Sequence, residues 1–72
     1  MGELGGFSGN DVIARLRRAG YVIVRQRGSH VRLRADGKRL ITVPRHKELG
    51  IGILKQIIND ADMTVEEFLE KN

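Results

Sequence analysis

Histidine and arginine alternate with apolar residues in one short segment, in which His30, Arg32 and Arg34 are separated by Val31 and Leu33. In a β-strand, the three polar residues would share one face and the two apolar residues the other. Arginine holds phosphate oxygens through paired hydrogen bonds and stabilises charge that develops on them. Imidazole can give or take a proton near neutral pH. The spacing therefore predicts a phosphodiester site in which His30 transfers a proton.

RNA is the phosphodiester that suits so simple a site. It carries its own nucleophile, the 2′-hydroxyl group, so cleavage needs only proton transfer and charge stabilisation, without a metal ion or a covalent enzyme intermediate. The tight corner Gly28-Ser29 directly before His30 would hold the histidine at the end of its strand. The alternative is that His30 is an exposed strand histidine that contacts a phosphate, or nothing, without doing chemistry.

Other candidate groups are weaker. His46 lies in a segment after Pro44 and could supply the second proton transfer, as could water or the substrate itself. Two histidines without cysteine, and without a carboxylate at ligand spacing, do not form a metal site, so we expect no metal and no cofactor. The Gly50-x-Gly52 pair lacks the further glycines and the preceding strand of a phosphate-binding loop.

The charge of the chain is unevenly distributed. Residues 13–47 contain nine arginines and two lysines but a single acidic residue, Asp36, whereas residues 48–72 contain two lysines and six acidic residues. A basic segment beside an acidic tail indicates a body that binds a polyanion. The preference for arginine over lysine favours paired hydrogen bonds to phosphate.

Length and composition limit the remaining possibilities. The 72 residues suffice for one domain, expected to span the whole chain, with residues 1–7 as a flexible, glycine-rich arm and residues 8–70 as the folded part. The absence of cysteine excludes disulfides and thiolate metal sites. No apolar run approaches the length of a membrane span or of a signal peptide. We therefore expect a cytoplasmic protein that does not associate with membranes.

The order of the predicted elements is α-β-β-β-α-α, which indicates an α+β domain of two layers, with helices on one face of an antiparallel sheet. A capping box at Ser8 and Asp11 begins the first helix and Gly20 ends it. A second capping box at Thr64 and Glu67 begins a short last helix. The other predicted elements are strands over 21–27, 29–34 and 39–43, an Asp-Gly turn at 36–37, and a helix over 51–61.

Two stretches resemble the HicA family, the toxins of bacterial and archaeal toxin–antitoxin pairs. They are Ala19-Gly20-Tyr21-Val22-Ile23-Val24-Arg25-Gln26-Arg27-Gly28-Ser29-His30-Val31-Arg32 and Thr42-Val43-Pro44-Arg45-His46-Lys47-Glu48-Leu49. The resemblance continues to Val65-Glu66-Glu67-Phe68-Leu69 and covers roughly residues 8–70. One position departs from the pattern: many relatives have threonine where this chain has Ile53, which can neither cap a helix nor contact substrate through a hydroxyl group.

The resemblance implies a double-stranded-RNA-binding-like fold and an mRNA interferase, a toxin that cleaves mRNA and arrests translation. The family's catalytic histidine falls on His30, and its Gly-Ser lead-in falls on Gly28 and Ser29. The partner it implies is an antitoxin of the HicB family, which covers the face that carries the histidine.

The main hypothesis is therefore an endoribonuclease toxin. His30 would be catalytic, as general acid or general base, and the expected RNA-binding residues are Arg25, Arg27, Gly28, Ser29, Arg32, Arg34, His46 and Lys47. One rival is a non-catalytic RNA-binding module that uses the same basic face. A third hypothesis is an interaction protein that docks an acidic partner there, and it predicts little salt dependence of RNA binding.

Overall fold

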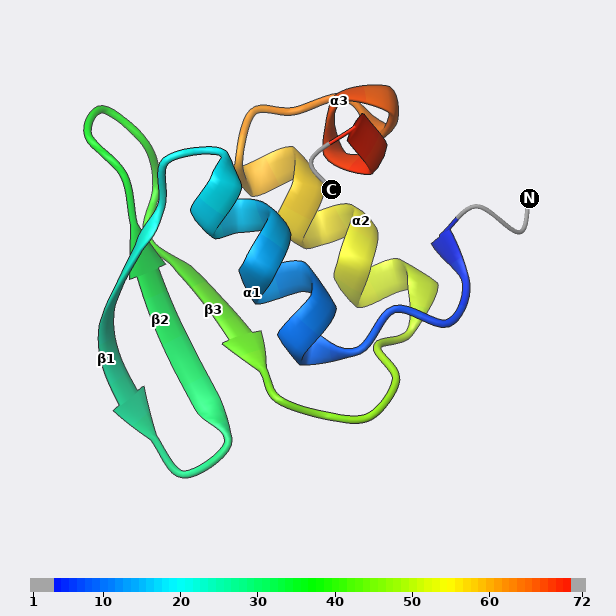
Figure 1. Ribbon diagram of the computed structural model, residues 1–72, viewed down its shortest axis with the longest axis horizontal. Helices are drawn as coiled ribbons and strands as arrows, with labels where there is room; N and C mark the ends of the chain where they lie inside the picture. Colours follow the sequence, from blue (N-terminus) through cyan, green and yellow to red (C-terminus); the bar gives the residue numbers. More distant parts are fainter. Residues whose placement is uncertain (1–3, 71–72) are drawn as a thin grey trace.

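The computed structural model describes residues 4–70 as one α+β unit (Figure 1). Its elements are α1 (Gly9–Arg18), β1 (Val22–Arg27), β2 (His30–Arg34), β3 (Ile41–Pro44), α2 (Ile51–Asp60) and α3 (Val65–Glu70). This order confirms the predicted double-stranded-RNA-binding-like fold with a short extra helix at its end.

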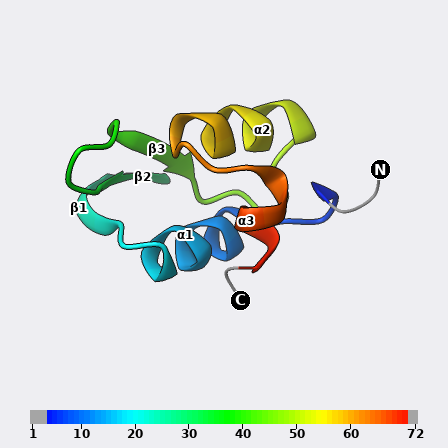
Figure 2. The same ribbon diagram turned by 90° about the horizontal axis from the view of Figure 1, so that it is seen from above.

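The three strands form one antiparallel sheet in the order β1-β2-β3. Seen from above, α1 and α2 lie on the same side of this sheet, and α3 lies beside them, away from the strands (Figure 2). The sheet therefore has a covered face towards the helices and an open face towards solvent, as the alternation in residues 30–34 predicts.

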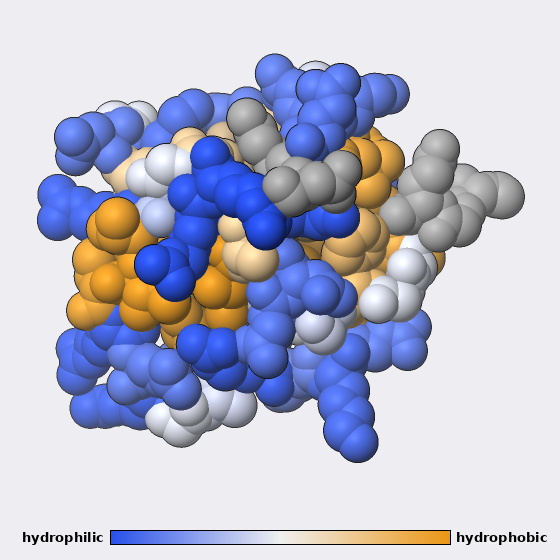
Figure 3. Space-filling view, viewed as in Figure 1, coloured by the Kyte–Doolittle hydropathy of each residue, from blue (hydrophilic) through white to orange (hydrophobic). Residues whose placement is uncertain are grey.

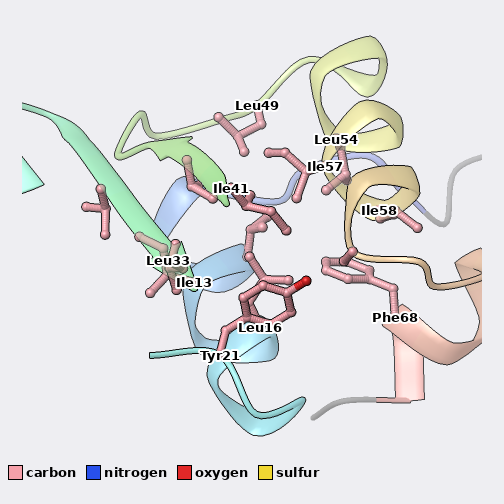
Figure 4. Packing of buried hydrophobic residues seen from close by; sticks show 14 of the residues in the cluster. Ile13, Leu16, Tyr21, Leu33, Ile41, Leu49, Leu54, Ile57, Ile58 and Phe68 are labelled. Carbon is pink, nitrogen blue, oxygen red and sulfur yellow. The ribbon is translucent and has the colours of Figure 1, made fainter. Parts of the chain in front are cut away.

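Apolar residues at alternate strand positions form the sheet's contribution to the core. Val31 and Leu33 of β2 are fully buried, and their partners across the ladder, Val43 and Ile41 of β3, are buried as well. Each helix buries most or part of its apolar stripe, including Leu16 of α1 and residues of α2 and α3 (Figure 4), whereas Ile51 at the start of α2 is exposed. The large helical core residues are Ile13, Leu16, Leu54, Ile57, Ile58 and Phe68.

Both predicted capping boxes are present. The Ser8 and Asp11 side chains each accept a hydrogen bond from the other residue's backbone N–H, at 3.0 Å in both directions. These bonds to Ser8 lower the pKa of the Asp11 carboxyl group. Thr64 and Glu67 form the same reciprocal pair at 2.8 and 3.1 Å. Each box satisfies backbone N–H groups that a helix N-terminus otherwise leaves unpaired.

The prediction of a flexible arm over residues 1–7 is wrong for the second half of that segment. Leu4 is buried in the core, and the ring of Phe7 packs edge-on against that of Phe68 at 5.5 Å between ring centroids. The carbonyl oxygen of Phe7 also accepts a hydrogen bond from the backbone N–H of Leu49 at 2.8 Å. Two apolar side chains among the glycines are thus enough to fix this segment to the core. Residues 1–3 lie outside the described residues.

The third strand is shorter at its start than predicted. The Asp36-Gly37 turn is present, with the Lys38 N–H donating to the carbonyl oxygen of Ala35 at 3.1 Å. Strand β3, however, begins at Ile41 rather than at Arg39. The pair nearest the turn joins Ile41 of β3 to Leu33 of β2, so residues 39–40 belong to the connection between the strands.

Gly9, the first residue of α1, lies against the backbone at the end of β3. Its N–H donates to the carbonyl oxygen of His46 at 2.9 Å. A Cβ atom at this position would lie 2.0 Å from the carbonyl oxygen of Pro44, which is closer than any side chain can approach backbone. Glycine is therefore required here for the contact between helix and strand.

Replacing Gly9 should expose this requirement. We expect Gly9→Ala to lower the free energy of unfolding by about 2–3 kcal/mol, because the backbone of Pro44 must move to admit the methyl group. The matched control is Gly52→Ala in α2, where the added Cβ meets nothing within 4 Å. In that variant the free energy of unfolding should rise by roughly 0.5 kcal/mol, because alanine has a higher helix propensity than glycine. Urea denaturation of both variants measures the difference, and equal effects would contradict the close contact.

Tyr21 carries a buried hydroxyl group that has no hydrogen-bond partner among residues 4–70. Burial, and secondarily the charges of Asp62 and Asp60, raise the pKa of Tyr21. A raised pKa in the folded state means that stability is fully present below the ordinary tyrosine value of about 10 and is lost as the pH rises through the raised value.

We therefore expect the parent chain to lose stability above about pH 10 more steeply than Tyr21→Phe. Near neutral pH the variant should be as stable as the parent or slightly more stable, because it removes an unpaired buried hydroxyl group. Thermal unfolding followed by circular dichroism from pH 7 to pH 11 tests both statements. Parallel losses in the two proteins at high pH would show that Tyr21 is not the group that titrates.

Candidate functional site

A hollow of about 290 Å³ lies on the open face of the sheet. It is lined by side chains from all three strands, namely Arg25, Arg27, His30, Arg32 and Thr42. All five are exposed, so the hollow is shallow and reachable by a large ligand such as a polymer chain. The predicted histidine and three of the predicted arginines thus lie together.

The register of the sheet explains how they meet. Arg27 of β1 pairs with His30 of β2, and Arg25 pairs with Arg32. On the other side of β2, Arg32 pairs with Thr42. Directly opposite residues in an antiparallel pair have Cβ atoms about 5 Å apart and project to the same face. His30 is therefore flanked by arginine both across the ladder and two residues along its own strand.

A β-bulge in β1 brings Arg25 and Arg27 to this face. Ile23 pairs with the buried Leu33, so a regular two-residue period would also turn Arg25 and Arg27 towards the helices. The register shifts between Ile23 and Arg25, where Val24 is the additional residue. The shift reverses which residues of the strand face solvent from that point on. The two arginines therefore line the hollow because of this single residue.

The turn between β1 and β2 is fixed by hydrogen bonds from two sides. Gly28 has a φ of 59°, a left-handed conformation that favours glycine. Its carbonyl oxygen accepts from the Gln26 side chain at 3.2 Å, and the carbonyl oxygen of Ser29 accepts from the Arg45 N–H at 2.7 Å. These bonds set the backbone immediately before His30.

The side chain of Arg45 ties this turn to the start of α1. Its guanidinium group donates to the side-chain oxygen of Asn10 and, at 3.5 Å, to that of Gln26. Gln26 pairs with the buried Val31, so it lies on the helix side of the sheet. Arg45 thus supports the hollow from behind rather than lining it.

The hollow is strongly basic. It contains three guanidinium groups, and within residues 4–70 no Asp or Glu side chain contributes to its lining. The described ion pairs join Lys38 to Asp62 and Arg39 to Asp60, away from the hollow. A concave surface with one sign of charge concentrates oppositely charged ligands. The arrangement is suited to an anionic ligand that approaches His30.

Not every predicted residue joins the hollow. Arg34 shares the open face but pairs with Val22, further along β2, and does not line it. Gly28 and Ser29 form the adjoining turn. His46 and Lys47 are exposed beyond the end of β3 and are also absent from the lining. The proposed role of His46 as a proton partner therefore receives no support from its position.

One lining residue, Thr42, was not predicted. Its neighbours Ile41 and Val43 are buried towards the helices, so the same alternation that selected His30 and Arg32 would have placed Thr42 on the open face. Its hydroxyl group adds a hydrogen-bonding group to a set of charged ones.

Two further features of the described chain bear on the kind of site. Within residues 4–70, no three His, Cys, Asp or Glu side chains are arranged to hold a metal ion. None of the helices in that range has the length and apolar character to cross a membrane.

Comparison with known proteins adds one finding. The model of a protein family described as "HicA toxin of bacterial toxin-antitoxin" matches residues 9–63, which include the whole sheet and the hollow. A search of curated proteins found no match.

The position of Gly28 beside the hollow makes a prediction. Gly28→Ala and Gly37→Ala each place alanine in a left-handed conformation, with open space around the new Cβ, so each should lower the free energy of unfolding by about 1 kcal/mol. Only Gly28→Ala should move the NMR signals of Arg27 and His30, because Gly37 lies at the other end of β2. Equal shifts of these signals in both variants would contradict a local role for Gly28.

Proposed function

The chain belongs to the HicA toxin family, which makes it the toxin of a toxin–antitoxin pair, and we propose that it acts as a metal-independent endoribonuclease that cleaves mRNA in the cytoplasm. The observation that carries this proposal is the position of His30 within a hollow whose other walls are Arg25, Arg27, Arg32 and Thr42. A residue that can transfer protons thus lies among groups that hold phosphate.

The arginines would bind the RNA backbone. Guanidinium groups hydrogen-bond the non-bridging oxygens of a phosphate in pairs and compensate the charge that builds there in the transition state. Arg27 and Arg32 are the nearest in register to His30, so we assign them to the phosphate that is cleaved. Arg25, and Arg34 further along β2, would contact neighbouring phosphates, while Gly28 and Ser29 hold the turn.

The reaction would use the substrate's own 2′-hydroxyl group. Its oxygen attacks the adjacent phosphorus, the bond from phosphorus to the 5′-oxygen breaks, and the products are a 2′,3′-cyclic phosphate and a 5′-hydroxyl end. His30 either accepts the proton that leaves the 2′-hydroxyl or donates the proton that the 5′-oxygen gains. Because His46 does not line the hollow, the other proton transfer falls to water or to a group of the substrate.

The partner that controls this activity would be an antitoxin of the HicB type. The basic face is open and shallow, so a protein that covers it excludes RNA simply by occupying the same area.

We expect His30→Ala to lower the rate of RNA cleavage by about 100-fold or more, the usual worth of a positioned acid or base. RNA affinity should stay within about threefold of the parent, because three guanidinium groups remain. The measurement uses a defined single-stranded RNA in EDTA, with cleavage followed on a gel and binding followed by fluorescence anisotropy on the 2′-deoxy analogue, which cannot be cleaved.

The matched control is His46→Ala, which removes an exposed histidine outside the hollow and should leave the cleavage rate within about threefold of the parent. If the parent binds RNA and does not cut it, the chain is a non-catalytic RNA-binding module. If His30→Ala and His46→Ala lower the rate equally, the assignment of the chemistry to His30 is wrong.

A further inference from the structure

Strand β1 has an open outer edge with apolar side chains along its first half. It is an edge strand of the sheet, and all six of its residues are exposed. Val22, Ile23 and Val24 have exposed fractions of 57%, 37% and 49%. An apolar area bordered by hydrophilic side chains appears at the left of Figure 3, over the region where Figure 1 shows β1.

Such an edge is a template for another strand. The unpaired N–H and C=O groups of an edge strand can hydrogen-bond an extended segment, and alternate side chains then provide contacts. Proteins usually protect edges of this kind with charge, proline or a covering loop. In β1 the charged residues come only after the bulge, at Arg25 and Arg27, so residues 22–24 carry apolar surface without that protection.

The charge around this edge selects the occupant. Arg25 and Arg27 continue β1 beyond the apolar part, and Arg17 and Arg18 are exposed at the end of α1, just before the strand. A second copy of this chain would bring four more arginines to an edge whose residues 17–27 contain no Asp or Glu, so the two basic edges would repel each other. A segment with apolar residues beside residues 22–24 and acidic residues beside the arginines would be complementary instead.

We propose that the antitoxin inhibits this chain by adding an extended, acidic and apolar segment to the outer edge of β1. Its backbone would pair with β1, its apolar side chains would cover Val22 and Val24, and its carboxylates would pair with Arg25 and Arg27. The presence of an antitoxin follows from the family; that its binding competes with RNA rests on the proposed function.

The site and the edge share residues, which gives the inhibition a physical cause. Arg25 and Arg27 line the hollow and also belong to β1. Carboxylates that pair with them would withdraw two of the three guanidinium groups that face His30. The antitoxin would thereby weaken RNA binding even without touching the histidine.

The double variant Val22→Thr/Val24→Thr tests this edge without changing charge or strand propensity. We expect its Kd for the cognate antitoxin to rise about tenfold or more, since two apolar contacts are lost at the centre of the interface. Neither side chain lines the hollow, and the bulge depends on the additional backbone residue at position 24 rather than on its side chain, so RNA cleavage by the free chain should be unchanged. The matched control is Ile53→Thr, which removes an apolar side chain of similar exposure (50%) from α2 and should leave the Kd unchanged.

A second measurement locates the contact directly. Backbone amide hydrogen exchange, measured on the His30→Ala chain free and in complex with the antitoxin, should show new protection in residues 22–27. Equal Kd values for the double variant and the Ile53→Thr control, or unchanged exchange in β1, would overturn the proposal. So would a free parent chain that dimerises in sedimentation while the double variant stays monomeric, since the edge would then serve self-association.

The two proposals can fail separately. If no chain cleaves RNA but the double variant still loses antitoxin affinity, the proposed endoribonuclease activity is wrong and the docking edge stands. If cleavage depends on His30 and the double variant binds the antitoxin as tightly as the parent, only the docking edge is wrong.

Discussion

The close contact between the start of α1 and the end of β3 is the constraint on which the site depends. Gly9 has no side chain, so its backbone can lie directly on Pro44 and Arg45, and its N–H can bind the carbonyl oxygen of His46. Pro44 is in turn the cross-strand partner of His30. A histidine on an exposed face has few packing neighbours of its own. Its backbone is instead held by the helix and the strand beneath it.

Arg45 extends this support to the turn before the histidine. Its backbone N–H binds Ser29, and its guanidinium group binds Asn10 and Gln26, so one residue joins α1, β3 and the β1–β2 turn. None of these atoms faces the hollow. Arg45 therefore contributes to the site by positioning the turn rather than by contact with a ligand.

The fold was largely predictable from the sequence, because local rules and the global arrangement agree. The capping boxes at Ser8 and Thr64, the alternation in residues 30–34 and the Asp36-Gly37 turn each predict an element that the structure contains. The prediction failed at residues 4–7, where glycine content indicated flexibility. The contacts that order this segment, from Leu4 and Phe7 to the core, are long-range in sequence and leave no local pattern.

The site was predictable in part for the same reason. The positions of His30 and Arg32 follow from strand periodicity, and the same rule applied to β3 would have found Thr42. The positions of Arg25 and Arg27 do not follow from periodicity, because periodicity alone predicts that these side chains face the helices. The bulge at Val24 decides their direction, and valine gives no signal of a bulge, which becomes visible only when the register with β2 is known. The resemblance to a family was needed to favour a catalytic His30 over an exposed strand histidine that does no chemistry.

The bulge also relates the two uses proposed for β1. A regular edge strand would turn Arg25 and Arg27 towards the helices and would leave the hollow with Arg32 as its one guanidinium group. With the additional residue, the first half of the strand keeps an apolar edge and the second half turns its charges towards the hollow. In a domain of this size, recognition of a partner and of a substrate must draw on the same few strands. A partner that binds the edge therefore reaches the arginines proposed to bind the substrate, without needing a separate inhibitory surface.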